Sequence, residues 1–268
     1  MPRLGVIGWP VEHSRSPAMF AAAFAALGMP DWSYQRLPIA PELFEQTVRG
    51  LPASGFLGAN VTIPHKQRAL ALAGSASAAA RAIGAANTLS FGPDGEIAAE
   101  NTDAPGLLAA IGEPVAGKQA LVLGAGGSAR AAVWALLGAG AAEVSVWNRT
   151  AERAVELALE LGARATTVPI AADLLVNCTS VGLRQSPSAA EQLNQLALSV
   201  DHVGTYACVV DLVYRDGPTP LLAMALAAGA RTVGGLEVLV AQGALGFELW
   251  TGTAAPLQAM REGAGLSV

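Results

Sequence analysis

The feature that most constrains the fold is a glycine-rich stretch near the middle of the chain, QALVLGAGGSAR at residues 119–130. A short run of Val and Leu precedes the glycines, and a run rich in Ala and Leu follows them. Strand, glycines and helix in this order form the context that a dinucleotide-binding turn requires. Glycines in this spacing could also belong to an ordinary strand–turn–helix that binds nothing. The strand before them and the helix after them favour a dinucleotide site.

Each small residue of this turn has a separate function in a dinucleotide site. Gly124 allows the tight turn after the strand, and Gly126 lets the backbone approach a pyrophosphate. Ala129 takes the third position, where a small side chain keeps helix and strand close. The first N–H groups of the helix carry a partial positive charge that attracts phosphates. We therefore predict cofactor contacts along the whole turn, from Gly124, Ala125, Gly126, Gly127, Ser128 and Ala129.

The residues that follow the next expected strand, residues 143–147, indicate which dinucleotide binds. After it come Asn148, Arg149 and Thr150, with Arg153 one helical turn further. An acidic side chain about 20 residues past the glycines would bind the ribose hydroxyls of NAD. Two guanidinium groups and a hydroxyl suit a 2′-phosphate instead, which predicts NADP. Alternatively, the two arginines could simply face water at the start of a helix. That alternative does not explain why the acidic residue typical of NAD sites is absent here.

The rest of this half of the chain continues the alternation of strands and helices. Several short strands end in polar residues or glycine, which is typical of a parallel sheet with its ligand edge at the carboxyl ends of the strands. After Gly235 the pattern becomes purely helical. The expected strands are 165–169, 174–178 and 208–213, and the expected helices are 219–228, 237–250 and 256–262.

Near the start of the chain, two serines stand in a polar turn between an expected strand, residues 4–8, and an expected helix, residues 18–27. Ser14 and Ser16 are followed by Pro17, which suits the first turn of a helix. One serine is enough to cap the helix N-terminus. The other hydroxyl is then left for a ligand.

The segment NVTIPHK at residues 60–66 also carries residues suited to chemistry. Polar and apolar side chains alternate in it, so Asn60 and Thr62 share one face of a strand. A proline ends the strand and directs Lys66 away from the sheet. A lysine after a strand is most often a solvated charge, but the next expected helix, residues 67–72, is too apolar to indicate an open polar surface.

Further polar residues lie near the ends of strands. The turn GPDG at residues 92–95 predicts a hairpin, and around it fall Asn87, Asn101 and Asp103. Asp103 could simply cap the helix expected after it, although capping does not exclude a second role. Gln242 lies among apolar residues, so its amide is bonded either to backbone or to a ligand.

Length and composition limit the classes of protein to which the chain can belong. The 268 residues suffice for one large or two modest domains. A net charge of −5 without any basic stripe gives no reason to expect nucleic acid. Cys178 and Cys208 have neither C-x-x-C spacing nor a nearby histidine cluster, so no disulfide framework or metal is expected. The sequence contains no signal peptide pattern and no membrane-spanning apolar stretch, so we expect a cytoplasmic protein that stays off the membrane.

Several separated blocks of the sequence resemble the shikimate dehydrogenase family, and the resemblance covers nearly the whole chain. One block alone is weak evidence, whereas all of them in this order are specific. The blocks are SRSP at 14–17, NVTIPHK at 60–66, GAANT at 84–88, NTD at 101–103, GAGGSAR at 124–130, NRT at 148–150, NCTSVG at 177–182, DLVY at 211–214, TPLL at 219–222, Gln242, and LWTG at 249–252.

The resemblance implies an α/β protein of two domains with a cleft between them. Residues 1–103 and 237–268 would form a substrate-binding domain, completed by the C-terminal helices, and residues 104–236 a Rossmann-type NADP-binding domain. The implied enzyme is an NADP-dependent oxidoreductase that acts on a CH–OH group. It reversibly reduces 3-dehydroshikimate to shikimate in chorismate and aromatic amino acid biosynthesis, as a monomer or homodimer whose partners are small molecules.

The resemblance also assigns roles to single residues. Lys66 would give a proton to the substrate oxygen that gains charge as hydride arrives, and Asp103 would orient Lys66. The residues matching those that hold the substrate carboxylate are Ser14, Ser16 and Tyr214. Thr62, Asn87 and Gln242 would bind the ring hydroxyls of the substrate or help to position the catalytic pair. Cofactor contacts beyond the glycine turn are expected from Asn148, Arg149, Thr150, Arg153, Thr179, Ser180, Val213 and Gly235.

Three other protein classes share parts of this pattern. A quinate or quinate/shikimate dehydrogenase often uses NAD, against which Arg149 and the two serines argue. A non-catalytic NADP sensor could keep the glycine turn while losing Lys66 or Asp103, and both are present. A dehydrogenase acting on folate or an amino acid would not combine these blocks. Phe20 and His65 depart from the residues usual in the family, with an effect that the sequence leaves open.

Overall fold

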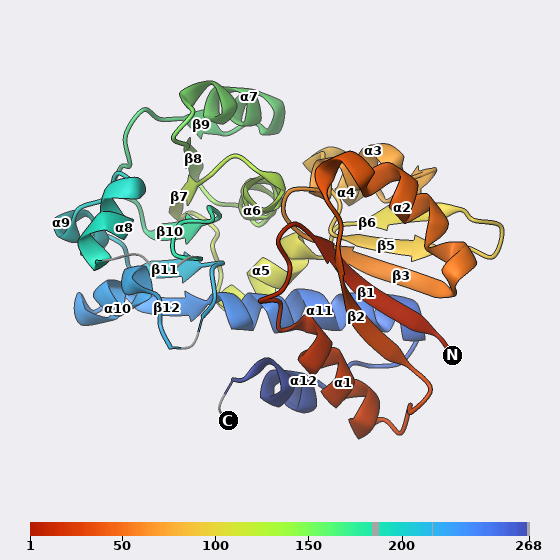
Figure 1. Ribbon diagram of the computed structural model, residues 1–268. Helices are drawn as coiled ribbons and strands as arrows, with labels where there is room; N and C mark the ends of the chain where they lie inside the picture. The colour runs from red at the N-terminus through yellow and green to blue at the C-terminus, as the bar shows by residue number, and fades with distance from the viewer. Residues whose placement is uncertain (184–187, 216, 267–268) are drawn as a thin grey trace. The chain divides into compact units, whose positions relative to one another are not determined.

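The computed structural model describes residues 1–183, 188–215 and 217–266, and it divides into two compact units. Unit 1 comprises residues 1–106 and 239–268, and unit 2 comprises residues 107–238. Each unit is built around a six-stranded sheet (Figure 1). Two helices, α5 (Asp103–Ile111) and α11 (Gly235–Thr251), contain residues of both units.

The sheet of unit 1 has the strand order β2-β1-β3-β5-β6-β4. Its strands β1 (Arg3–Gly8), β2 (Ser33–Pro38) and β3 (Phe56–Val61) are parallel, because a helical crossover connects each to the next. Antiparallel to β3 runs β5 (Thr88–Phe91), which forms the predicted hairpin with β6 (Ile97–Glu100). The short β4 (Ser75–Ala76) pairs with β6 at the edge.

Helices cover both faces of this sheet. Side chains alternate along β1, so Leu4 faces one apolar cluster and Ile7 the other. The Leu4 cluster is formed by α1 (Ser16–Ala26), α11 and α12 (Leu257–Ala264). The Ile7 cluster includes side chains of α2 (Phe44–Gly50) and α3 (Lys66–Leu72). The remaining helical segments of unit 1 are α4 (Ala78–Ile83) and two 3₁₀ turns, η1 (Pro41–Leu43) and η2 (Pro52–Ser54).

The sheet of unit 2 is parallel throughout and confirms the predicted parallel sheet of the α/β fold. Its order is β12-β11-β10-β7-β8-β9, which in chain order reads 3-2-1-4-5-6 from the β9 edge, the order of a dinucleotide-binding sheet. The strands are β7 (Gln119–Leu123), β8 (Glu143–Trp147), β9 (Arg164–Ala165), β10 (Leu174–Asn177), β11 (Cys208–Asp211) and β12 (Arg231–Gly234). The helices are α6 (Gly127–Gly138), α7 (Ala151–Leu161), α8 (Ala189–Gln195), α9 (Val200–Val203) and α10 (Pro220–Ala227).

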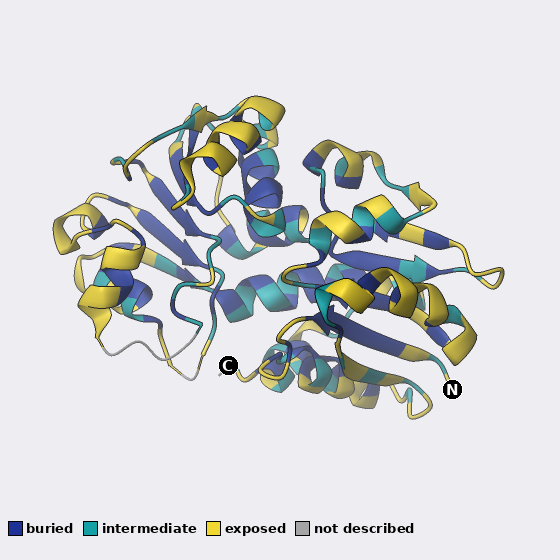
Figure 2. Ribbon diagram, turned by 45° about the horizontal axis from the view of Figure 1, so that its top comes forward, coloured by how far each residue is buried: buried dark blue, intermediate teal, exposed yellow. Residues whose placement is uncertain are grey.

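Burial explains why the central strands of unit 2 are apolar without interruption. Ala120 and Val122 of β7 face one apolar cluster, and Leu121 and Leu123 face the other. A strand covered by helices on both faces buries every side chain, which gives a continuous apolar run. Figure 2 shows the central strands of both units largely buried, with most exposed residues on helices, loops and edge strands such as β2. Within the described residues, no helix is long and apolar enough to cross a membrane.

Two expected elements differ from the structure, and two helices were not expected. The strand expected at 165–169 is only the two-residue β9, because Thr166 Oγ1 bonds back to the carbonyl of Val168 and Pro169 has no N–H for a sheet ladder. The sequence pattern favours one helix at residues 41–51, which the structure splits into η1 and α2. The sequence reading also missed α8 and α9, two short helices without a marked apolar period.

Candidate active site

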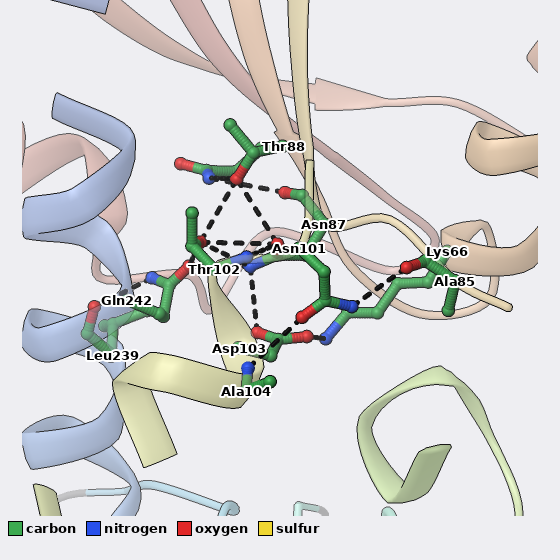
Figure 3. A network of polar contacts seen from close by, with 11 residues as sticks. Lys66, Ala85, Asn87, Thr88, Asn101, Thr102, Asp103, Ala104, Leu239 and Gln242 are labelled. Atoms are coloured by element: carbon green, nitrogen blue, oxygen red, sulfur yellow. Dashed lines mark hydrogen bonds and ion pairs between the residues drawn. The ribbon is translucent and has the colours of Figure 1, made fainter. Parts of the chain in front are cut away.

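Lys66 and Asp103 lie 37 residues apart in the sequence and form an ion pair in unit 1. Lys66 begins α3 and Asp103 begins α5. The Lys66 Nζ atom donates to Asp103 Oδ2 over 2.6 Å, and the two side chains are 11% and 17% exposed. Figure 3 shows the pair at one end of a network of amides and hydroxyls. The pair is thus mostly shielded from water but still reachable from outside.

The carboxylate of Asp103 is not used to cap its helix. Asn101 does this, because its Oδ1 atom accepts the backbone N–H of Ala104 over 3.2 Å. The Asn101 amide is held in turn by the carbonyl of Ala85, 2.9 Å away. Asp103 therefore keeps one oxygen for Lys66 and the other for Asn87 Nδ2, at 2.9 Å. The simple capping role considered for Asp103 is wrong, and its carboxylate is available for chemistry.

Asn87 lies at the centre of this network and is buried. Three acceptors surround its Nδ2 atom: Thr102 Oγ1 at 2.9 Å, Asp103 Oδ1 at 2.9 Å and Gln242 Oε1 at 3.0 Å. An amide NH₂ has only two hydrogens, so it serves two of the three at a time. Its Oδ1 accepts the backbone N–H of Thr102 over 2.7 Å. The Gln242 Nε2 atom donates to the carbonyl of Leu239 over 2.7 Å, which leaves Oε1 directed at Asn87.

The structure adds polar residues to the site that the sequence reading did not assign to it. Asn60 donates to the carbonyl of Asn87 and to Thr88 Oγ1, at 3.3 and 3.2 Å, and accepts from the Tyr34 hydroxyl over 2.8 Å. Thr88 and Thr102 lie within 3.2 Å of each other through their hydroxyls. In the sequence, Asn60 is indicated only by the alternation of polar and apolar residues at 60–62. Thr88 and Thr102 are indicated only because they are neighbours of Asn87 and Asp103.

Ser14, Ser16 and Thr62 each lie in a loop or helix start beside the strands of unit 1. Ser14 and Ser16 are buried, and Ser14 Oγ accepts the backbone N–H of Ser16 over 3.3 Å. The expected serine cap of α1 is wrong, because Arg15 stands at the N-cap and no side chain caps the helix there. In the described part of the chain, the hydroxyls of Ser16 and Thr62 have no hydrogen-bond partner. Both hydroxyls can therefore bond a ligand. Arg36 donates to the carbonyl of Ser14 over 2.7 Å and holds this loop.

The two departures from the family pattern, Phe20 and His65, are both buried. The ring of Phe20 stacks on Tyr34 with centroids 4.1 Å apart, within the apolar cluster of α1. The ring of His65 stacks on Phe44 at 4.5 Å, and its Nε2 lies 2.8 Å from the carbonyl of Ile39. Burial lowers the pKa of the His65 imidazole below its usual range. His65 therefore anchors the start of α3, directly before Lys66.

The glycine turn of unit 2 lies between β7 and α6. Gly124 has φ +111°, and a Cβ there would come within 3.2 Å of the backbone of Cys178. No side chain caps α6 at Gly126, and the space around Gly126 is open to 4 Å. Ala129 is fully buried in the apolar cluster that α6 forms with β7. The remaining predicted turn residues are partly exposed: Ala125, Gly127 and Ser128. The N-terminus of α6, which no side chain caps, thus faces the side from which an anion would approach.

The segment after β8 carries the predicted 2′-phosphate residues. Asn148 Nδ2 donates to the carbonyl of Thr150 over 2.9 Å and shapes the loop before α7. Arg149 and Arg153 are exposed, and among the described residues neither guanidinium has a hydrogen bond or ion pair. Two unpaired cations close together, with no acidic residue in the loop, suit a doubly charged phosphate better than a ribose diol.

Polar groups at the ends of β10 and β11 form a second network, in unit 2. Asn177 Nδ2 donates to Asp211 Oδ1 over 2.9 Å, and Thr219 Oγ1 donates to Asp211 Oδ2 over 2.6 Å. Asp211 is 1% exposed, and burial raises the pKa of its carboxyl to about 6. Three predicted ligand contacts lie beside this network in the same unit: Thr179, Val213 and Tyr214. Tyr214 thus belongs to a different unit from Ser14 and Ser16, and its contact with the substrate stays a prediction.

Three family models match the chain. The first, described as the shikimate dehydrogenase substrate binding domain, matches residues 6–89. The second, shikimate / quinate 5-dehydrogenase, matches residues 107–180. The third, the shikimate 5′-dehydrogenase C-terminal domain, matches residues 235–262. Together they cover most of both units.

Curated proteins and solved structures agree with these matches. The "Shikimate dehydrogenase (NADP(+))" of Methylobacterium radiotolerans is 46% identical over 94% of this chain and 92% of its own length. That of Methanopyrus kandleri is 41% identical over 97% and 93%. The Thermus thermophilus shikimate 5-dehydrogenase, solved with NADP(H) and shikimate, is 42% identical over 99% of both chains with a TM-score of 0.85. A 5-ketofructose reductase of Gluconobacter is 28% identical over 98% and 97%, with a TM-score of 0.80.

Proposed function

The chain belongs to the shikimate dehydrogenase family, and we propose that it catalyses the reversible, NADP-dependent reduction of 3-dehydroshikimate to shikimate. This reaction is a step of chorismate and aromatic amino acid biosynthesis. The observation that carries the proposal is the Lys66–Asp103 ion pair, 2.6 Å long and set in a network of amides and hydroxyls. Such a pair suits proton transfer to a carbonyl oxygen beside a hydroxyl-rich ring.

When bound, NADPH supplies the hydride that reduces the carbonyl carbon. The carbonyl oxygen then gains negative charge, and Lys66 Nζ donates a hydrogen bond and a proton to it. Asp103 orients the ammonium group and stabilises its charge before transfer. Asn87 fixes the other carboxylate oxygen of Asp103, so the pair is held from two sides. In the reverse direction the same lysine takes the proton of the substrate hydroxyl.

The proposed substrate contacts rest partly on polar groups that remain available and partly on the family resemblance. Ser16 and Thr62 have hydroxyls without partners in the described part of the chain, and Ser14 adds a third. We assign the ring hydroxyls to Thr62, Asn87 and Gln242, and the carboxylate to the two serines with Tyr214. Losing one such contact in a site shielded from water costs about 1–3 kcal/mol, which is a measurable rise in KM.

The residues of unit 2 fit NADP. The uncapped N-terminus of α6 and the open space at Gly126 suit a pyrophosphate, and Arg149 with Arg153 suits the 2′-phosphate. Unit 2 would therefore be the NADP-binding domain and unit 1 the substrate-binding domain, close to the boundaries 104–236 and 1–103 with 237–268. Cys178 and Cys208 form no disulfide, which suits a reducing cytoplasm. We further propose that the protein acts as a monomer or homodimer.

The proposal is tested by product analysis. Purified protein is incubated with shikimate and NADP, and the product is identified by mass and chromatography against authentic 3-dehydroshikimate. We expect NADPH and 3-dehydroshikimate in equal amounts, and consumption of both when the reaction is started from the product side. NADPH formed without 3-dehydroshikimate, or no turnover in either direction, contradicts the proposal. The 5-ketofructose reductase relative makes that sugar a useful additional substrate in the same assay.

A further inference from the structure

One buried carboxylate, Asp211, lies where two loops with predicted cofactor residues begin. Asp211 ends β11, and Asn177 ends the neighbouring β10 at the paired position of the parallel ladder (Figure 1). We infer that Asp211 is a positioning residue for NADP, which holds residues 178–181 after β10 and residues 212–214 after β11 in one fixed arrangement. This inference deepens the proposed function and rests on it.

The loop after β10 is tied to Asp211 through Asn177. The Asn177 Nδ2 atom donates to Asp211 Oδ1, so the amide oxygen faces the opposite way, toward its own loop. That oxygen accepts the backbone N–H of Thr179 over 3.0 Å and its hydroxyl over 2.8 Å. Thr179 Oγ1 in turn accepts the N–H of Val181 over 3.1 Å. The orientation of one amide thus fixes the backbone around Thr179 and Ser180.

The loop after β11 is tied to the same carboxylate at both of its ends. Asp211 Oδ1 accepts the N–H of Val213 over 3.1 Å, and Oδ2 accepts the hydroxyl of Thr219 over 2.6 Å. Thr219 also caps α10 by accepting the N–H of Leu222. A third segment packs against this loop, because a Cβ on Gly235 would come within 2.5 Å of the carbonyl oxygen of Leu212. Val213 and Gly235 are both predicted cofactor contacts.

The chemistry of the three donors explains why this residue is a carboxylate. An amide N–H, a backbone N–H and a hydroxyl converge on its two oxygens. A carboxylate accepts all of them, whereas an asparagine would offer one oxygen and an NH₂ group to the same donors. A buried carboxylate without an ion-pair partner is costly to keep, as the raised pKa of Asp211 reflects. The three hydrogen bonds that it accepts tie together the two segments that carry predicted cofactor contacts.

The first test compares Asp211→Asn with Asp173→Asn. Asp173 is a control carboxylate at the opposite end of the same strands: it is exposed, and its Oδ2 accepts the N–H of Gln119 over 2.8 Å where β7 and β10 begin. NADPH affinity is measured by fluorescence titration, and KM values for NADP and shikimate by initial rates. For Asp211→Asn we expect NADPH affinity and the KM for NADP to worsen about tenfold, as for one lost charged hydrogen bond, with the KM for shikimate unchanged. Asp173→Asn should match the wild type.

A second pair of variants decides the question if Asp211→Asn does not fold. Thr219→Val removes the hydroxyl that Asp211 accepts, and Thr219→Ser restores it. We expect weaker NADPH binding for the valine variant and normal binding for the serine variant. Wild-type NADPH affinity in Asp211→Asn, or in Thr219→Val if only that variant folds, overturns the inference. A wild type that binds NADPH but does not oxidise shikimate contradicts the proposed function instead, while the binding comparison still decides the role of Asp211.

Discussion

Replacing Lys66 by methionine is expected to remove most of the turnover and leave the fold intact. Methionine keeps the apolar stem of the side chain but can neither donate a proton nor bond Asp103. We expect kcat to fall by about 10²–10⁴-fold, the usual contribution of a positioned proton donor. The KM for shikimate should change by less than about tenfold, because at most one hydrogen bond to the bound substrate is lost.

The geometry of the Lys66–Asp103 pair determines how much Lys66→Met lowers the free energy of unfolding. At 2.6 Å and an effective dielectric of about 20, the attraction between Lys66 and Asp103 is about 6 kcal/mol before desolvation is subtracted. Desolvation of both charges offsets most of this. Without Lys66, the Asp103 carboxylate retains the Asn87 amide as donor and some contact with water, since its side chain is 17% exposed. We therefore expect Lys66→Met to lower the free energy of unfolding by only about 1–2 kcal/mol.

A double-mutant cycle tests whether the two residues act as a unit. If Asp103 works through Lys66, Asp103→Asn combined with Lys66→Met should lose about as much turnover as Lys66→Met alone. Losses that multiply would mean that the two residues act independently, which contradicts the roles assigned here.

The chain provides its own control, because Lys118 is its only other lysine. Lys118 pairs with Glu113 over 3.0 Å in unit 2, and both side chains are more than a third exposed. Initial rates of shikimate oxidation are compared for wild type, Lys66→Met and Lys118→Met, with unfolding in urea as the check on stability. Lys118→Met should match the wild type. A Lys66→Met enzyme within about tenfold of wild-type kcat would refute the reasoning.

Three further predictions concern the cofactor, the backbone and pH. Arg149→Ala should raise the KM for NADP about tenfold or more and leave that for NAD unchanged, and equal losses would count against a 2′-phosphate contact. Gly124→Ala should lower the free energy of unfolding in urea by about 1–3 kcal/mol, because φ is +111° and Cys178 blocks the Cβ; an unchanged value contradicts this. Since the pKa of His65 is lowered in the folded state, stability should decline as the pH falls below about 6.5, the unfolded value, and level off below the folded pKa. In His65→Phe that decline in the pH profile of unfolding should shrink, and an identical profile would exclude His65 as its source.

Much of the fold could be predicted because its patterns are local. The glycine turn at residues 124–127 and the apolar strands ending in polar residues predicted the parallel sheet of unit 2, and the structure confirms it. The family predicted from the sequence blocks is confirmed as well. Errors arose where local chemistry overrides pattern, as at Thr166, whose hydroxyl bonds to Val168 and ends β9 early.

The polar networks could not be predicted, because their bonds join residues far apart in the chain. Asn87 and Gln242 are 155 positions apart, and Asn60 and Tyr34 are 26. Nothing in the sequence indicates that Asn101, rather than Asp103, caps α5. Asp103 was predicted from its block, but its freedom to pair with Lys66 became visible only in three dimensions. The substrate and cofactor roles of single residues stay predictions until variants are measured.

The most direct test of the central claim is a set of four steady-state assays, with shikimate or quinate as substrate and NADP or NAD as cofactor. We predict the highest kcat/KM for shikimate with NADP. The value should fall strongly when quinate replaces shikimate and when NAD replaces NADP. The highest kcat/KM for quinate with NAD would contradict the account, since Arg149 and the serines at positions 14 and 16 would then not have the roles assigned to them.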